Sequence, residues 1–272
     1  MSTPLLYESH CHTPLCHHAE GDPVEYAAAA EQAGLKGIIF TCHCPLPDGL
    51  SASVRMNPLQ YELYHRMIAE AREQFAGRLD VRVGLESDYL PGIEPWLENL
   101  HGRRPLNHVL GSVHPQLGDY RNRFYHGDDF AFQQTYFQHV AEAAETGLFD
   151  TMAHPDLVKN MPPQSWDFDR IQPDIARMLD RVAATGVAME LNTSGVNKAL
   201  PEMNPGTAML TMMHERGIPV VIGADAHVPH RVADGYREAL QTLQAVGYEN
   251  VHVFLEREPH AIAIDAALAS LA

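Results

Sequence analysis

Histidines and carboxylates recur along this chain at spacings that suit metal binding. The chain has 17 histidines, and His10 and His12 are two residues apart. On an extended strand both side chains would face the same side and could hold one ion. Asp225 and His227 repeat this spacing near the other end of the chain. The further candidates between these two pairs are His43, Glu86, His114 and His154.

The first 44 residues also hold all four cysteines, together with two more candidate histidines. His17 and His18 are adjacent in the first loop, and only one of them need point inward. The simplest interpretation of Cys11, Cys16, Cys42 and Cys44 is that they are small side chains packed beneath the loops. An alternative is a structural zinc site, because cysteine and histidine supply such sites. That alternative site would consist of Cys16, His18, Cys42 and Cys44.

Two observations weigh on the chemistry of these cysteines. The Cys-x-Cys spacing around His43 is shorter than the usual separation of about two to four residues between zinc-binding cysteines. A disulfide framework is not expected, because the chain is large and begins without an export signal.

Alternating strands and helices would bring the candidate residues together. Short apolar runs alternate with longer amphipathic stretches, which predicts parallel strands joined by crossover helices. Seven or eight such units without a Pro/Gly/Ser-rich linker predict a single domain over residues 1–272, an α/β barrel that is closed or nearly closed. The predicted strands are Leu5–Ser9, Gly37–Thr41, Val81–Leu85, His108–Val113, Asp150–Ala153, Val187–Leu191, Val220–Gly223 and Val251–Leu255. The predicted helices are Pro23–Ala33, Pro58–Phe75, Phe130–Thr146, Ile171–Ala184, Thr207–Glu215 and Val232–Val246.

The ends of the predicted strands carry the candidate ligands. Catalytic residues of α/β barrels come from the carboxyl ends of the strands and the loops that follow them. All of the first seven predicted strands except the sixth end in a residue that can bind a metal, and the sixth ends in the less diagnostic Glu190-Leu-Asn192. So many ligands exceed the needs of one four-coordinate zinc. The sequence therefore predicts a multinuclear cluster in which Glu86 bridges two metals about 3.5–4 Å apart, as in two-metal hydrolases.

Composition and charge exclude several classes of function. The chain has 272 residues, and its formal net charge of −16 argues against a broad surface for nucleic acid or anionic membranes. No run approaches the roughly 18 apolar residues that a membrane helix requires. The first residues lack a basic region followed by an apolar stretch, so a cytoplasmic location is expected. The sequence leaves the oligomeric state open.

These motifs, taken together, resemble the PHP (polymerase and histidinol phosphatase) superfamily. The resemblance runs from residue 8 to about 255, with the motifs in family order. It rests on Glu8-Ser-His10-Cys-His12, Thr-Cys-His43, Gly-Leu-Glu86, Gly-Ser-Val-His114, His154-Pro-Asp and Asp225-Ala-His227. The histidinol-phosphatase branch is indicated by His12-Thr-Pro-Leu-Cys-His-His18-Ala-Glu-Gly, Gly-Leu-Glu86-Ser-Asp-Tyr, Asp156-Leu-Val-Lys159 and Asn192-Thr-Ser-Gly195. The resemblance implies a distorted (β/α)7 TIM-like barrel with a three-metal site at the C-terminal face of the strands.

The resemblance also implies which residue binds which metal. The first metal would be held by His10, His12, Glu86 and Asp225. Glu86 would bridge to a second metal, held by His114 and His154. The third would be held by His18, rather than His17, with His43 and His227. The expected catalytic residues are Glu86, Asp225 and His227.

Metal identity stays open at this stage, and one position departs from the family pattern. Nitrogen and oxygen ligands fit three divalent ions of Zn, Mn or Fe alike. The family usually has an acidic residue before the second-motif histidine, where this chain has Cys42. That residue is expected to orient His43 from outside the ligand set, so its change is expected to alter the affinity for the third metal or to admit a softer ion.

Such a cluster suits the hydrolysis of a small phosphate ester. Coordination lowers the pKa of water toward about 7, and the metals neutralise phosphoryl oxygens. The predicted phosphate contacts are Arg55, Lys159 and Lys198, and Asp48 and Glu202 are candidates for binding an amine. The expected function is hydrolysis of L-histidinol phosphate to L-histidinol and phosphate in histidine biosynthesis. The alternatives are a PHP phosphoesterase of other or broader specificity, for a sugar phosphate or nucleotide, and a catalytically silent metal-binding domain.

Overall fold

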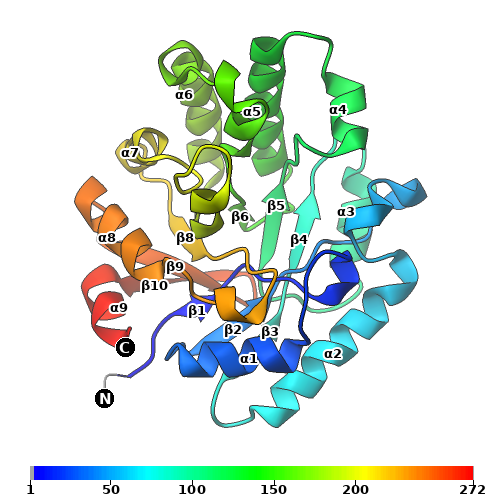
Figure 1. The fold of residues 1–272 in the computed structure, drawn as a ribbon, viewed down its shortest axis with the longest axis vertical. Coiled ribbons are helices and arrows are strands. Elements are labelled where there is room, and N and C mark those ends of the chain that lie inside the picture. The colour runs from blue at the N-terminus through cyan, green and yellow to red at the C-terminus, as the bar shows by residue number, and fades with distance from the viewer. Residues whose placement is uncertain (1–2, 272) are drawn as a thin grey trace.

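Parallel strands, most of them followed by a helix, form the frame of the molecule (Figure 1). The computed structural model describes residues 3–271. Its strands are β1 (Tyr7–Glu8), β2 (Gly37–Phe40), β3 (Asp80–Val83), β4 (Leu85–Asp88), β5 (Val109–Ser112), β6 (Thr151–Met152), β7 (Ala188–Asn192), β8 (Val220–Gly223), β9 (Asn250–Leu255) and β10 (Glu258–Ala263). Its α-helices are α1 (Pro23–Gln32), α2 (Tyr61–Gln74), α3 (Glu94–His101), α4 (Gly118–Phe124), α5 (Asp129–Glu145), α6 (Phe168–Thr185), α7 (Thr207–Glu215), α8 (Tyr236–Val246) and α9 (Ile264–Ser270).

The strands form two sheets that meet in a barrel-like ring. One sheet has the order β1-β2-β3, and the other has the order β10-β9-β8-β7-β6-β5-β4. Isolated parallel bridges join the sheets at both ends, between His43 and Glu86 and between Cys11 and Ala226. The second bridge includes a backbone hydrogen bond of 3.0 Å from His12 N to Ala226 O. The ring therefore runs from β1 to β8 and back to β1, and every pairing within it is parallel.

The third predicted strand is divided into two strands that pair with different neighbours. Sequence analysis treats 81–85 as one strand, but β3 pairs with β2, and β4 pairs with β5. Gly84 lies between β3 and β4, and a Cβ at this position would lie only 2.3 Å from the His108 carbonyl oxygen. Glycine is needed here because the two backbones approach so closely. As a result Glu86 lies within β4, where sequence analysis placed it just beyond a strand end.

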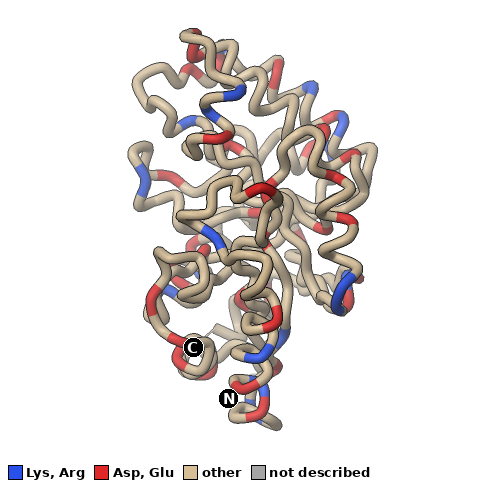
Figure 2. The backbone as a smooth tube through the Cα atoms, turned by 90° about the vertical axis from the view of Figure 1, so that its right-hand side faces the viewer, with Lys and Arg blue, Asp and Glu red and all other residues tan. Residues whose placement is uncertain are grey.

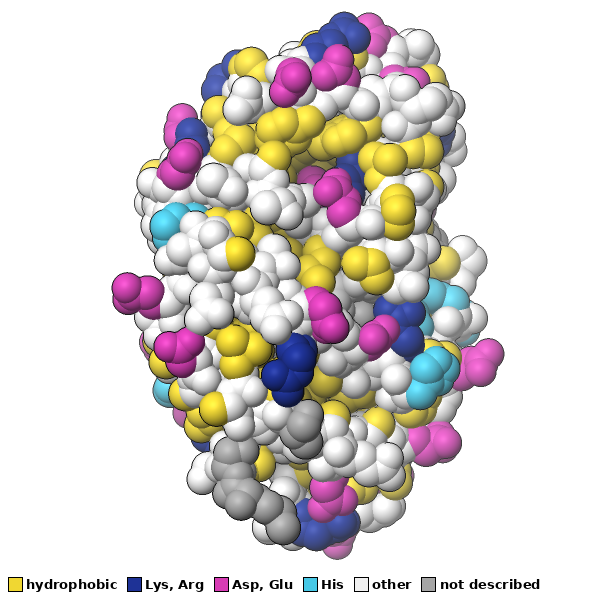
Figure 3. Space-filling model, turned by 60° about the vertical axis from the view of Figure 1, so that its left-hand side comes forward, with side chains coloured by type: hydrophobic (Ala, Val, Ile, Leu, Met, Phe, Trp, Pro, Cys, Tyr) yellow, Lys and Arg dark blue, Asp and Glu magenta, His cyan; other side chains and the backbone are white. Residues whose placement is uncertain are grey.

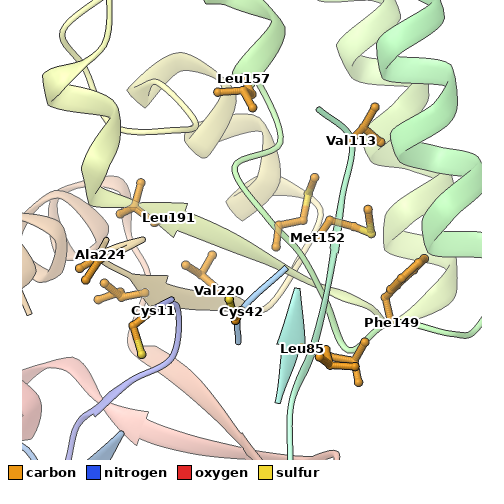
Figure 4. Packing of buried hydrophobic residues seen from close by; sticks show 14 of the residues in the cluster. Cys11, Cys42, Leu85, Val113, Phe149, Met152, Leu157, Leu191, Val220 and Ala224 are labelled. Atoms are coloured by element: carbon orange, nitrogen blue, oxygen red, sulfur yellow. The ribbon is translucent and has the colours of Figure 1, made fainter. Parts of the chain in front are cut away.

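Helices cover the outside of the strands and enclose a continuous hydrophobic core (Figure 1). Helices α5 and α6 pack against each other on one side, and α1 and α2 pack on another. Figure 4 shows core side chains from successive strands and the segments that follow them, including Leu85, Val113, Met152, Leu191 and Val220. This core holds the strand ends in fixed positions, so the side chains that follow them can converge.

A hairpin lies beyond the ring. The eighth predicted strand appears as β9, which pairs with β8 and forms an antiparallel hairpin with β10. Sequence analysis missed β10, whose residues are mostly exposed. It also missed the short helices α3, α4 and α9.

Charged side chains are spread over the molecule. Acidic and basic positions interleave along the backbone in Figure 2. On the face shown in Figure 3, lysine and arginine lie scattered among acidic and hydrophobic side chains. Within residues 3–271, no helix combines the length and the apolar character needed to cross a membrane.

Candidate metal centre

Glu86 lies at the middle of a cluster of five histidines that come from four different parts of the chain. Its Oε1 is 3.3 Å from His114 Nε2 and 3.0 Å from His154 Nε2. Its Oε2 is 2.8 Å from His43 Nδ1, 3.4 Å from His10 Nε2 and 3.7 Å from the same atom of His12. The carboxylate is fully buried. Each of its oxygens therefore faces a different set of imidazoles.

Asp225 brings the end of β8 into the same cluster. Its Oδ1 is 3.2 Å from His12 Nε2, 3.7 Å from His10 Nε2 and 3.4 Å from His227 Nδ1. The Asp225 backbone has a positive φ of 50°, an uncommon conformation for a non-glycine residue. With this backbone conformation the Asp225 carboxylate faces His12, which is 213 residues away in sequence.

The first loop turns His18 toward the cluster. His17 has a φ of 67°, and this left-handed residue ends the short 3-10 helix Pro14–Cys16. His18 Nδ1 lies 2.7 Å from the Cys16 carbonyl oxygen, and His18 Nε2 lies 2.9 Å from His227 Nε2. His227 in turn stacks on His12, with ring centroids 3.9 Å apart. All nine side chains that sequence analysis named as ligands thus lie around one centre.

Three buried carboxylates that sequence analysis did not assign support this cluster from outside. Glu190 Oε1 is 2.7 Å from His10 Nδ1, and its Oε2 accepts a hydrogen bond of 2.8 Å from the backbone N–H of His154. Asp88 Oδ2 is 3.1 Å from His114 Nδ1. Because a carboxylate accepts the proton of one ring nitrogen, it leaves the other nitrogen free to bind a metal.

Glu8, the third carboxylate, ties the end of β1 to the far end of the chain. It accepts hydrogen bonds from the backbone N–H groups of His10, Ala224 and Ala233, at 3.0, 3.0 and 2.9 Å. The Tyr236 hydroxyl lies 3.0 Å from the same carboxylate. These three carboxylates could have been found in the sequence only by their positions. Glu8 and Asp88 lie within the motifs, and Glu190 is a polar residue at a strand end.

Electrostatics within the cluster favour charged carboxylates and act on the imidazoles in opposite directions. Burial alone would lower the pKa of His12 and His114, but the neighbouring carboxylates raise these pKa values to about 9 and about 10. Burial would raise the pKa of the Glu86 carboxyl, but His43, His10 and His114 together hold it well below its usual range. Burial would likewise raise the pKa of the Asp225 carboxyl, but His10 and the other nearby cations hold it well below its usual range. Burial lowers the pKa of His43 to about 4 and that of His227 to about 3. Deprotonated carboxylates and neutral imidazoles are the forms that bind metal ions.

The donor atoms fit a bound cation. His10 Nε2 and Glu86 Oε2 are both buried and make no hydrogen bond among the described residues. Buried polar atoms are normally satisfied, so such facing lone pairs call for a positive charge between them. The ligand atoms lie within 4.8 Å of one another in each of three overlapping groups, namely His10, His12 and Glu86; His10, His154 and Asp225; and His12, His43 and His227.

Two of the three cations predicted to contact phosphate are buried in ion pairs. The Arg55 guanidinium binds the Asp88 carboxylate through two hydrogen bonds, of 2.7 and 3.2 Å. The Lys159 ammonium contacts Asp156 Oδ2, Glu202 Oε1 and the Met203 carbonyl oxygen, at 2.9, 3.0 and 2.9 Å. These contacts use all three ammonium donors. Both cations therefore stabilise the walls of the site as they stand.

The remaining predicted substrate contacts lie nearer to solvent. The Lys198 side chain is 27% exposed, and its Nζ is 4.0 Å from Asp225 Oδ2 and 3.2 Å from Ser194 Oγ. Asp48 is exposed in the loop after β2. Glu202, the other candidate for binding an amine, is the partner of Lys159 described above. Of the three predicted phosphate-binding cations, Lys198 is the one that lies beside a candidate metal ligand, Asp225, and is partly exposed.

The cysteines separate into different environments. All four are buried free thiols. Cys42 Sγ accepts hydrogen bonds from Thr13 N and Thr13 Oγ1, at 3.4 and 3.3 Å. These contacts do not involve His43, and the expected effect of Cys42 on His43 stays a prediction. Cys44 has Arg55 and Asp88 as its charged neighbours. The alternative zinc site would require Cys16 and Cys44 to bind the same ion. Cys16 lies beside Cys42 and two histidines, however, whereas Cys44 lies beside Arg55 and Asp88.

Replacing Arg55 by alanine should destabilise the fold. The change would leave the Asp88 carboxylate buried without its cation, which typically costs about 3–5 kcal/mol of the free energy of unfolding. Denaturant unfolding of the purified variant would measure this loss. Arg78→Ala is the matched control, because the Arg78–Glu31 pair is exposed and should contribute at most about 1 kcal/mol. Equal stability losses in the two variants would contradict the role assigned to Arg55.

Comparisons with known proteins agree with the fold and show the family. Residues 8–194 match the PHP domain. The chain is 39% identical to a probable histidinol-phosphatase of Deinococcus radiodurans, over 90% of this chain and 95% of that protein. It is 25% identical to a histidinol-phosphatase of Bacillus subtilis, over 86% of this chain and 98% of that protein. The chain therefore belongs to the PHP domain family.

A solved structure shows the same fold. The histidinol phosphate phosphatase of Lactococcus lactis, described as complexed with Zn, L-histidinol and phosphate, superposes with a TM-score of 0.78. The match covers 93% of this chain and 98% of that one, at 18% identity. The fold of this chain is thus the distorted barrel that its sequence predicts.

Proposed function

We propose that this protein is a metal-dependent phosphomonoesterase that hydrolyses L-histidinol phosphate to L-histidinol and phosphate, a reaction of histidine biosynthesis. The observation that carries the proposal is the Glu86 carboxylate, which lies between two sets of imidazoles. The two relatives described above, which match nearly the whole chain, have this activity as their description. The complete ligand set argues against a silent domain. A cytoplasmic location and a single domain over residues 1–272 are part of the proposal.

Three divalent ions of Zn, Mn or Fe would be held by the nine side chains. When bound, such ions supply positive charge for the phosphoryl oxygens and lower the pKa of a water molecule. The first set of ligands is His10, His12, Glu86 and Asp225; the second is Glu86, His114 and His154; the third is His18, His43 and His227. The catalytic residues in this proposal are Glu86, Asp225 and His227.

The chain's own outer residues would keep these ligands in position. Glu190 holds the His10 ring through Nδ1 and also fixes the backbone of His154. Asp88 holds the His114 ring in the same way, and Arg55 holds Asp88. The imidazoles are therefore fixed before a substrate arrives, which lowers the reorganisation needed at the moment of reaction.

Lys198 would contact the phosphate of the substrate. Its ammonium lies beside Asp225 and keeps part of its side chain exposed. Lys198→Ala is therefore expected to lower kcat/KM for histidinol phosphate by about tenfold, the effect of losing roughly 1.4 kcal/mol. The melting temperature should change little. Steady-state kinetics with thermal melting would check both; an unchanged kcat/KM would remove Lys198 from the phosphate site.

Selectivity for histidinol phosphate tests the function itself. Histidinol phosphate carries an amine and a ring that p-nitrophenyl phosphate, a sugar phosphate and a nucleotide do not reproduce. Binding energy from those remote groups should raise the rate as well as the affinity. We expect kcat/KM for histidinol phosphate to exceed that for p-nitrophenyl phosphate by about a hundredfold or more. Phosphate release measures both values.

The variant Asp48→Asn tests which residue recognises the amine of the substrate. If Asp48 binds the amine, the variant should lose efficiency with histidinol phosphate alone. Equal kcat/KM values across the wild-type panel would instead favour a phosphoesterase of broader specificity.

A further inference from the structure

Two thiols lie beside the candidate centre and are not part of its nitrogen and oxygen ligand set. Cys16 ends the short helix Pro14–Cys16, and Cys42 lies two residues beyond the end of β2. Both side chains are fully buried. Both belong to the main core cluster, and Figure 4 shows Cys42 among the side chains of that cluster.

The two sulfur atoms and one imidazole form a compact set of soft donors. The ligand atoms of His12, Cys16 and Cys42 all lie within 4.8 Å of one another. In a tetrahedral zinc site, with Zn–S about 2.3 Å and Zn–N about 2.0–2.1 Å, neighbouring donors lie about 3.5–3.8 Å apart. Only a small adjustment of these side chains would therefore enclose an ion.

A separate observation points to a ligand at this place. His12 directs Nε2 to Asp225, at 3.2 Å, so that nitrogen belongs to the centre already described. The other nitrogen, Nδ1, is buried and has no hydrogen-bond partner among residues 3–271. By comparison, the Nδ1 atom of His10 faces the Glu190 carboxylate, at 2.7 Å. His12 thus keeps a buried donor atom beside two sulfur atoms and no carboxylate.

Further contacts would complete such a site. Cys16 also belongs to a second donor group, with His18 and His227, whose ligand atoms likewise lie within 4.8 Å of one another. Both imidazoles are proposed ligands of the third metal, so the sulfur site would border that metal, and its fourth position would be left to a water molecule. Thr13 donates two hydrogen bonds to Cys42 Sγ, and the Cys42 thiol donates one to the Thr13 carbonyl oxygen, at 3.6 Å. Once the thiol proton is lost to bind an ion, the two donors from Thr13 would stabilise the negative charge on that sulfur.

We propose that Cys16 and Cys42 form, with His12, a binding site for a thiophilic divalent cation such as Zn²⁺, next to the nitrogen and oxygen centre. The proposal rests on the proposed function, because His12 belongs to both sites. Thiolate ligands select softer ions than carboxylates do. The protein would therefore hold chemically different ions side by side, with Cys42 as one of the residues that select them.

Zinc K-edge X-ray absorption on the wild-type, zinc-loaded protein tests the site without any mutation. The expected spectrum contains sulfur scatterers at about 2.3 Å from zinc, in addition to nitrogen and oxygen at about 2.0–2.1 Å. A spectrum that requires nitrogen and oxygen alone would overturn the proposal. Phosphate release from histidinol phosphate is measured on the same sample. If the sample is active but shows no sulfur scattering, the sulfur site is wrong and the proposed function stands. If it shows sulfur scattering but no activity, the proposed function is wrong and the sulfur site stands.

Cobalt substitution identifies the sulfur atoms. Co²⁺ added to the metal-free protein should give a thiolate-to-cobalt charge-transfer band in the near ultraviolet. Cys16→Ser and Cys42→Ser should each reduce this band by at least about half, because each removes one of the two sulfur ligands, and the double variant should abolish it. Cys44→Ser is the matched control, since Cys44 is equally buried but neighbours Arg55, and it should keep the full band. A full band in Cys16→Ser, or its loss in Cys44→Ser, would contradict the assignment.

Discussion

Replacing Glu86 by glutamine is expected to lower kcat for histidinol phosphate by about a hundredfold to a thousandfold, the scale seen when a preorganised charge-stabilising group is removed. Glu86 is the carboxylate whose two oxygens face different sets of histidines, His114 and His154 on one side and His10, His12 and His43 on the other. An amide keeps the shape but removes the negative charge that would hold two ions. Steady-state kinetics and elemental analysis of the purified variant would measure both effects.

Glu190→Gln is the control for this variant. Glu190 contacts His10 and the His154 backbone from outside the ligand set, and losing such an outer contact typically costs about 10–100-fold. The variant should keep more activity and more metal than Glu86→Gln. The bridging role of Glu86 would be wrong if Glu86→Gln kept wild-type turnover and full metal content.

Removing the metal ions is expected to abolish activity and also to destabilise the fold. Without cations, the buried Glu86 carboxylate and several imidazoles are left facing one another with unpaired donor atoms. An ion present at a thousand times its dissociation constant stabilises the folded state by about 4 kcal/mol, so chelation should lower the free energy of unfolding by that order. Thermal or denaturant unfolding with and without chelator gives the difference.

The specificity of that result depends on two further measurements. Adding back zinc, manganese or iron(II) should restore stability and activity together, and the most effective ion would identify the metal. A His65→Gln variant controls for histidines in general, because His65 lies on α2 outside the cluster and should leave the chelation effect unchanged. Full stability and full turnover after complete metal removal would contradict the metal centre.

Much of the fold could be predicted because its signals are local. The helix from Pro23 and the strand Val220–Gly223 appear where the apolar pattern places them. The division of the third strand could not be predicted, because it depends on the His108 carbonyl lying against Gly84, a contact between segments 24 residues apart. The hairpin strand Glu258–Ala263 was missed because its residues are too exposed to give an apolar pattern.

Most of the candidate ligands could be named from sequence because they follow or lie in a barrel strand, whose position the pattern predicts. His18 lies in a loop and was chosen over His17 only through the family resemblance. The outer partners of the ligands could not be named from sequence. Asp88 and Glu190 gain their roles only when β4 and β7 place them behind His114 and His10. Arg55 was given a phosphate-binding role for the same reason, since only the three-dimensional structure shows its guanidinium paired with Asp88.

A crystal structure of the metal-loaded protein with phosphate, with anomalous scattering measured at the metal edges, tests the central claim most directly. The account predicts anomalous peaks on both sides of the Glu86 carboxylate, about 3.5–4 Å apart, with phosphate oxygens directed at them. It also predicts a third peak beside His18 and His227. Anomalous peaks located away from Glu86, or phosphate bound elsewhere on the molecule, would contradict it.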